Sequence, residues 1–374
     1  MSATEALIYS HLLLIRATAV QPRLCHRLLA LLGDVQSACD HFVASEHGSK
    51  CGLKYPAALR LQERLRAPAL HQQVEMDLAW LKGARRFFVD WESQDYPQLL
   101  RQIDDPPIGL FCVGDLRIFR ASQLAVVGSR HPTQYGRSVV KHLVGRLVDR
   151  GLSITSGMAL GIDGIAHAAS LASGGTTIAV LGTGPDQVYP PQHASLYSEI
   201  QNRGLIVSEF PPGTTAAPNH FPQRNRVVTG LSLGTLVVEA RLKSGSLISA
   251  RLAMEQGREV FAVPGSVLSK LSEGCHQLLR DGAKLTAHEQ DVLEELDLES
   301  MVSVAQARSN PSDGLTPLQT QLLNVLDLEP QTQDRVAELV GVAASEVIRT
   351  LVELEIVGLV ELGLGGYRLI KPWS

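Results

Sequence analysis

The chain has 374 residues, of which 45% are hydrophobic and 19% charged, so it can form two or three domains with a sizeable core. No segment is long and apolar enough to span a membrane, and the first residues lack the basic region and cleavage site of a signal peptide. The five cysteines form no CxxC pair, which argues against a zinc site or a disulfide framework. We therefore expect a cytoplasmic protein.

The formal net charge of −4 hides an uneven distribution. Residues 1–109 hold 12 Lys and Arg against 12 Asp and Glu, and residues 110–290 hold 17 against 12. Residues 291–314 hold 1 against 6, and residues 315–374 hold 4 against 8. A basic middle and an acidic end predict separate partners, although an ordinary solvated surface is an alternative reading of so small an excess.

Residues 1–72 are predicted to form a small helical domain, because apolar residues such as Leu24, Leu28 and Leu31 recur at helical spacing. The stretch that follows is broken by prolines, which predicts an extended lead-in to the next domain. These prolines are Pro97, Pro106 and Pro107.

Residues 123–263 alternate short apolar runs with amphipathic stretches. The runs predict strands at 124–127, 152–155, 177–181, 205–208, 235–238 and 260–263, and the stretches predict helices at 134–150, 161–173, 192–203 and 245–257. Strands buried on both faces and joined by helices form a doubly wound parallel sheet. Such a sheet binds ligands beyond the carboxyl ends of its strands.

Residues 296–314 form an acidic and then polar stretch that we expect to be a linker. Three helices are predicted beyond it, at 317–325, 333–339 and 345–354. Residues 357–370 alternate around glycines and predict a β-hairpin. Three helices followed by a hairpin indicate a winged-helix domain over residues 315–374.

The predicted strands end in loops rich in glycine and hydroxyl side chains. Glycine lets a backbone approach a ligand closely, and the amides of a following helix favour an anion. Arginine adds a planar charged group, and an aromatic ring can stack on a base. The residues that these arguments select are Gly128-Ser129-Arg130, Ser156-Gly157, Phe221, Arg224-Asn225-Arg226 and Lys243-Ser244-Gly245.

Each of these loops has a plainer interpretation, such as a tight turn at Gly128 or an ion-paired helix start with a buried ring at Phe221–Arg226. Gly182-Thr183-Gly184 lacks the rest of a dinucleotide fingerprint, and no GxxxxGK[ST] sequence exists, so we expect no nucleotide cofactor. His167 has no Cys or His partners at ligand spacing, so we expect no metal site.

Taken together, the central segments resemble the DNA-processing protein A family, also called Smf. The matching segments are VVGSR (126–130), SGMALGIDGIAH (156–167), AVLGTG (179–184), FPQRNRVVTGLS (221–232), VVEARLKSGSLISA (237–250), GREVFAVPG (257–265) and EGCHQLLRDGA (273–283). The resemblance implies an N-terminal helical (SAM-like) domain over 1–72, a Rossmann-like domain over 76–295, a linker over 296–314 and a winged helix over 315–374.

The resemblance also implies a recombination mediator without catalytic activity. Such a protein binds incoming single-stranded DNA, forms homodimers through the Rossmann-like domain and loads RecA during natural transformation. By motif match, the DNA-contacting role falls on Gly128, Ser129, Arg130, Arg224, Asn225 and Arg226, with Phe221 and Lys243 nearby.

Two other interpretations stay open. One is an enzyme of the nucleoside-monophosphate phosphoribohydrolase type on a related fold; the chain has Gly234-Thr235 but no preceding PGG, and Glu239 falls one residue late. The other is a winged-helix transcription regulator whose Rossmann-like domain senses a small ligand. The candidate recognition helix carries Glu346 and Glu353 beside a single Arg349, so we expect it to bind protein instead.

Overall fold

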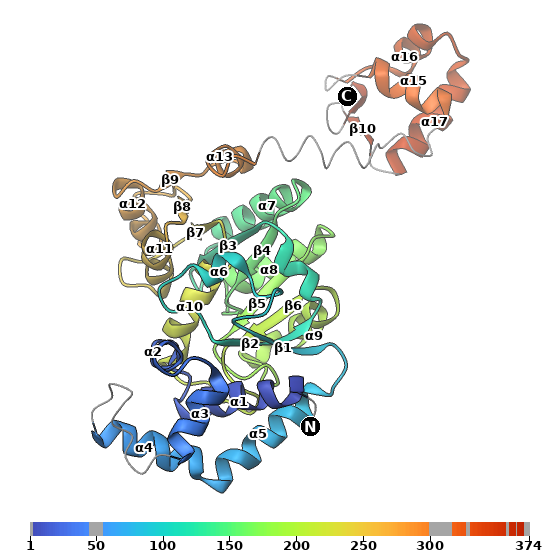
Figure 1. Ribbon diagram of the computed structural model, residues 1–374. Helices are drawn as coiled ribbons and strands as arrows, with labels where there is room; N and C mark the ends of the chain where they lie inside the picture. Colours follow the sequence, from blue (N-terminus) through green and yellow to red (C-terminus); the bar gives the residue numbers. More distant parts are fainter. Residues whose placement is uncertain are drawn as a thin grey trace. The chain divides into compact units, whose positions relative to one another are not determined.

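The computed structural model describes residues 3–44, 55–298, 316–326, 330–356, 359–363 and 365–369 (Figure 1). The chain divides into two compact units, residues 1–302 and residues 303–374, and each is considered by itself. Within the described ranges, no helix is long and apolar enough to cross a lipid bilayer.

The first unit begins with five helices, α1 (Ala3–Ala17), α2 (Pro22–Leu32), α3 (Val35–Ala44), α4 (Tyr55–Arg66) and α5 (Pro68–Leu81). Prolines occupy the first turns of α2 and α5, where no backbone amide is needed for a helical hydrogen bond. The five helices share a core that includes Leu28, Phe42 and Leu65, and this core extends to Phe111 of the sheet. Because α5 runs through residues 72–76, the domain boundary expected there is still only a prediction.

The sheet of the first unit has nine described strands in the order β1-β2-β6-β5-β4-β3-β7-β8-β9. All neighbours from β6 to β9 run parallel, whereas β1 and β2 are antiparallel additions at one edge. The strands are β1 (Arg86–Asp90), β2 (Gly109–Gly114), β3 (Gln123–Gly128), β4 (Ser153–Ser156), β5 (Thr177–Leu181), β6 (Leu205–Ser208), β7 (Gly234–Val238), β8 (Glu259–Ala262) and β9 (Lys284–Leu285).

Helices cover both faces of this sheet, as the alternation along β3 shows. Leu124 and Val126 pack in the core that contains α7 and α8, whereas Ala125 and Val127 pack in the core that contains α10 and α11. The helices after β1 are α6 (Gln98–Arg101), α7 (Gln134–Asp149), α8 (Ile162–Ala172), α9 (Ala194–Arg203), α10 (His220–Gly230), α11 (Gly245–Glu255), α12 (Glu273–Arg280) and α13 (Glu289–Glu295).

The predicted Rossmann-like sheet is confirmed, with all six strands and four helices close to their expected positions. Two features differ from the prediction. The proline-rich lead-in contains the strands β1 and β2, and the segment 220–230 is the helix α10, for which the sequence offered an ion-paired helix start only as an alternative interpretation. The apolar spacing in α10 is weak because two of its buried side chains are arginines, Arg224 and Arg226.

The second unit contains α15 (Pro317–Val325), α16 (Gln333–Val340), α17 (Ala344–Ile356) and a hairpin of β10 (Val360–Gly363) and β11 (Gly366–Leu369). Its core joins the helices to the hairpin through residues such as Leu322, Val336, Leu351 and Tyr367. The winged-helix prediction is confirmed. The expected linker over 296–314 lies outside the described residues, apart from its first three positions.

Candidate nucleic-acid interface

A cavity of about 660 Å³ opens at the carboxyl ends of β3 and β7, between α8, α10 and α11. Nine of the predicted site residues line it, together with Arg241 and the buried Asp163. The nine are Gly128, Ser129, Arg130, Phe221, Arg224, Asn225, Lys243, Ser244 and Gly245. The loops that the sequence separates by more than a hundred residues therefore meet at one place.

The end of β3 lies between β7 and α8, in close contact with both. A side chain at Gly128 would collide with the carbonyl oxygen of Val238 and would lie 2.7 Å from Ile162, so this position requires glycine. The hydroxyl of Ser246 donates a hydrogen bond of 2.8 Å to the Gly128 carbonyl and ties this loop to α11. The loop is thus held rigidly, while the side chain of Arg130 is exposed.

The first turn of α8 completes this side of the cavity. Gly161 has a φ of +81°, and a side chain there would meet the backbone of Ser129 and Arg130. The amide of Ile162 donates to the Ser129 carbonyl at 3.1 Å. These contacts explain why small residues follow β4: they allow two loops to pack against each other at the strand ends.

Ser156 and Gly157 at the end of β4 have different positions. Ser156 is fully buried and its hydroxyl donates to the Val126 carbonyl at 2.6 Å, so it joins two strands and does not reach the cavity. Gly157 lines a smaller adjoining pocket of about 70 Å³, where it lies against the guanidinium of Arg224. The expected direct contact of Ser156 with a ligand is therefore replaced by a structural role.

Arg224 projects from α10 beneath the cavity, where its guanidinium donates to the backbone carbonyls of Gly157 and Val180. Burial lowers the pKa of Arg224 to about 10, the carboxylate of Asp163 opposes this shift, and Arg130 adds to it. Arg224 consequently stays protonated at neutral pH. It joins the ends of β4 and β5 and supplies a fixed positive charge to the wall of the cavity.

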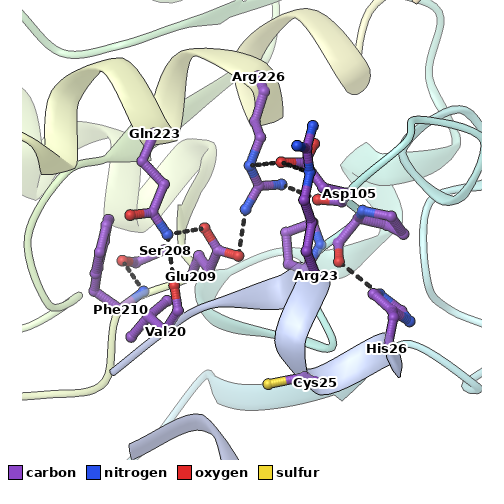
Figure 2. A network of polar contacts seen from close by, with 12 residues as sticks. Val20, Arg23, Cys25, His26, Asp105, Ser208, Glu209, Phe210, Gln223 and Arg226 are labelled. Atoms are coloured by element: carbon purple, nitrogen blue, oxygen red, sulfur yellow. Dashed lines mark hydrogen bonds and ion pairs between the residues drawn. The ribbon is translucent and has the colours of Figure 1, made fainter. Parts of the chain in front are cut away.

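Arg226 lies on the other face of α10, away from the cavity, because residues two apart on a helix do not face the same way. Figure 2 shows its guanidinium between Glu209 and Asp105; the bond to the Asp105 carbonyl is 2.5 Å long. Gln223 donates to Glu209 at 3.3 Å and to the Val20 carbonyl at 2.8 Å. The structure thus corrects the role expected for Arg226, which joins α10 to Glu209 after β6 and to Asp105, while the neighbouring Gln223 contacts the N-terminal segment at Val20.

The segment before α11 forms the far wall. Arg241 and Lys243 are exposed, and no hydrogen bond or ion pair joins either side chain to another described residue. The hydroxyl of Ser244, directly before the first turn of α11, is buried without a partner among the described groups. Cations, an unused hydroxyl and the amides of a helix start therefore face the same space.

Two residues that line the site, Arg241 and Tyr189, were not among those predicted from the sequence. Arg241 alternates with Lys243 in an exposed loop, a spacing that could have indicated it. Tyr189 lines the smaller pocket, and its ring lies 5.3 Å from that of Phe221 at an angle of 35°. No local sequence signal connects these two aromatic residues, which come from different loops.

Glu239, the residue that an enzyme of the phosphoribohydrolase type would use, has its carboxylate occupied. It accepts hydrogen bonds from the amide of Thr133, at 2.8 Å, and from the hydroxyl of the same residue. Gly136 leaves room for it at the first turn of α7. Glu239 therefore stabilises the start of α7.

Both units match models of known protein families. The family model of DNA recombination-mediator protein A matches residues 87–297, and that of the DprA winged helix domain matches residues 306–366. Protein Smf of Escherichia coli (strain K12) is 38% identical over 346 residues, which cover 90% of this chain and 92% of that protein.

Two solved structures are similar to this chain. DNA processing protein A from Streptococcus pneumoniae has a TM-score of 0.66 and 36% identity, covering 79% of this chain and 99% of that one. The protein of the same name from Helicobacter pylori has a TM-score of 0.51 and 33% identity, covering 56% and 95%; its structure describes a single-stranded DNA binding mode. The chain therefore belongs to the DNA recombination-mediator protein A family, also known as DprA or Smf.

Proposed function

We propose that the chain binds single-stranded DNA in the cavity at the carboxyl ends of its strands. The observation that carries this proposal is the convergence of exposed cations, Arg130, Arg241 and Lys243, on a cavity in which Asp163, itself buried, is the only carboxylate among the described lining residues. Unpaired guanidinium and ammonium groups attract phosphates, and the half-buried ring of Phe221 offers a face on which a base can stack.

Within this proposal, the glycine loops and the cations have separate tasks. Gly128, Ser129, Ser244 and Gly245 offer close backbone approach and hydrogen bonds to phosphate oxygens, and Asn225 is placed to donate or accept. Arg224 contributes charge from below without leaving its carbonyl partners. These groups contact the phosphates of the DNA more than the edges of its bases. The affinity should therefore depend little on the DNA sequence and should fall as the salt concentration rises.

The wider role that we propose is that of a recombination mediator, which loads RecA onto incoming strands in the cytoplasm during natural transformation. The family description supports mediation, and the Helicobacter pylori relative supports the single-stranded substrate. We propose no catalytic step, because the carboxylate of Glu239 is engaged by Thr133. Incubation with nucleoside monophosphates should therefore release no free base.

We further propose that the Rossmann-like unit forms a homodimer, as the resemblance to the family implies. Leu285 of β9 is 50% exposed, and an apolar side chain of this kind can be buried by a second copy. The winged helix, by contrast, is proposed to bind protein, because the exposed face of α17 carries Glu346 and Glu353 and would repel duplex phosphates.

The test of DNA binding is a titration of the full chain with labelled single strands at several salt concentrations, with duplex DNA as competitor. We expect tight binding of the single strand, a linear fall of log affinity with log salt, and little displacement by duplex. Equal affinity for single strand and duplex, or none for either, would overturn the proposal.

A further inference from the structure

A second hollow of about 800 Å³ lies beside the cavity, along the surface where α7 and α8 pack against each other. Arg130 and His131 form one end, and Arg137 and Lys141 of α7 form one wall. The floor comes from α8 and the residues before it, and the other end is closed by His193 and Leu196. We call this hollow the α7–α8 groove.

The two cations in the wall of the groove are unpaired among the described residues. Arg137 and Lys141 are exposed and lie one helical turn apart, so their side chains leave the same face of α7. Neither forms a hydrogen bond or an ion pair with another described residue, and no carboxylate is among the described residues that line the groove. Arg146, on the same helix but outside the groove, does pair with Glu289 at 3.1 Å. The positive potential of the groove is thus left for a ligand.

The floor of the groove is apolar, because α8 presents glycine, alanine and one isoleucine there. These residues are Gly164, Ile165, Ala168, Ala169 and Ala172. A side chain at Gly164 would meet the ring of His193 at 2.7 Å or less, so this glycine lets His193 lie close to α8. Cations beside an apolar floor suit a polymer with charged linkages and flat apolar rings, as single-stranded nucleic acid is.

The groove is continuous with the cavity, since Arg130 and His131 line both. A strand held in the cavity passes Arg130 as it leaves in this direction and then meets Arg137 and Lys141. We propose that the α7–α8 groove is a second segment of the single-strand path, in which these two side chains bind phosphates of nucleotides beyond those in the cavity. This inference rests on the proposed function.

The experiment compares affinity against oligonucleotide length. Deoxythymidine oligomers from about 4 to about 16 nucleotides, the range of site sizes in single-strand-binding OB folds, are titrated with the full chain at several salt concentrations. The variants are Arg137→Ala with Lys141→Ala and, as a control that removes two cations at the C-terminal end of α7 outside the groove, Arg146→Ala with Arg150→Ala.

For the groove variant we expect unchanged affinity for the shortest oligomers and weakened affinity for the longest. Its salt slope with long oligomers should be smaller in magnitude by about 1.4, which is about 0.7 for each lost phosphate contact. The control should keep the slope of the wild type. A second variant, Ala168→Glu, places a carboxylate on the floor and should weaken long oligomers only. Thermal melting of each variant checks that it is folded.

The outcomes separate this inference from the proposed function. If the wild type binds single strands and Arg130→Ala weakens them at every length, but the groove variant equals the wild type at every length, the groove is not part of the path. Equal weakening of short and long oligomers also overturns the inference, because the two cations would then belong to the cavity itself. If the wild type binds no single strand, the proposed function fails first.

Discussion

Arginines gather at two places on either side of α10, the cavity at the strand ends and the junction with the N-terminal helices shown in Figure 2. At the junction, Arg226 is buried and contacts both Glu209 and Asp105, and Arg23 lies 3.6 Å from Asp105. In the cavity, Arg130 is exposed and pairs with no other described residue.

The difference shows that the number of cations in a segment does not identify a binding surface. A buried cation that meets a carboxylate has its charge satisfied within the fold and stabilises the contact between elements. An exposed cation without such a partner keeps its potential for a ligand. The segment 221–226 contributes one arginine to each region, so the two can be separated by substitution.

The largest effect on stability is expected for Arg226→Ala. It leaves the Glu209 carboxylate buried without its partner, which should lower the free energy of unfolding by about 3 to 5 kcal/mol in urea denaturation. Removing both charges, with Arg226→Met and Glu209→Leu, should restore much of that loss. A stable Arg226→Ala protein that no longer binds single strands would show that Arg226 contacts DNA after all.

Arg130→Ala should weaken DNA binding without lowering stability, the opposite of Arg226→Ala. Because Arg130 is exposed and unpaired among the described residues, its loss should leave the urea midpoint unchanged. Single-strand affinity should fall by about 1.5 to 3 kcal/mol, the usual contribution of a charged hydrogen bond, and the salt slope should shrink by about 0.7. Arg130→Lys, which keeps the charge, serves as the control. Binding equal to the wild type in gel shifts would refute the assignment of this residue.

A third prediction concerns His167 of α8, which is fully buried and contacts Thr177 of β5 through Nδ1 at 2.7 Å. Burial lowers its pKa to about 3, whereas in an unfolded chain it is about 6.5. Between these values the unfolded chain binds the extra proton, so stability falls as the pH drops below about 6.5, by up to about 1.4 kcal/mol per pH unit.

The measurement for His167 is urea denaturation at several pH values between about 4 and 7, for the wild type and His167→Asn. The variant removes the titrating group but keeps a donor for Thr177. Its stability should therefore depend less steeply on pH than that of the wild type. Parallel curves for the two proteins would show that His167 does not titrate as its burial demands.

The smallest effect is expected from removing the winged-helix unit. Helix α17 of this unit is acidic and holds Arg349 as its only cation, whereas three exposed cations line the cavity. A chain that ends at residue 302 should therefore bind single strands as tightly as the full chain. Filter binding of both proteins at the same salt concentration measures this. Weaker binding by the truncated chain would place part of the DNA contact in the winged helix.

Much of this architecture was predictable because parallel strands leave a strong local signal. Runs such as Leu124–Val127 are apolar at every position, since both sheet faces are covered, and glycine and serine follow them directly. The rule that ligands bind at carboxyl ends of such strands then indicated where Gly128, Arg130, Lys243 and Ser244 would meet.

The directions in which side chains point were harder to predict from the sequence. Helix α10 was predicted only as an alternative, an ion-paired helix start, because its buried Arg224 and Arg226 break the apolar pattern that identifies a helix. Without the helix, nothing in the sequence shows that these two arginines face opposite ways. The partners of Arg226 come from segments far away in the chain, and only the folded structure brings them within reach.

By itself, then, the sequence determined the sheet, the winged helix and the glycine-rich loops at the strand ends, because each depends on residue types at short spacing. Tertiary structure decided which cations are free. Arg130 and Lys243 face the cavity unpaired, Arg224 is fixed beneath it, and Arg226 is neutralised by Glu209. The physical reason is that a charge is available to a ligand only if no opposite charge in the fold lies closer, and such proximity arises from packing.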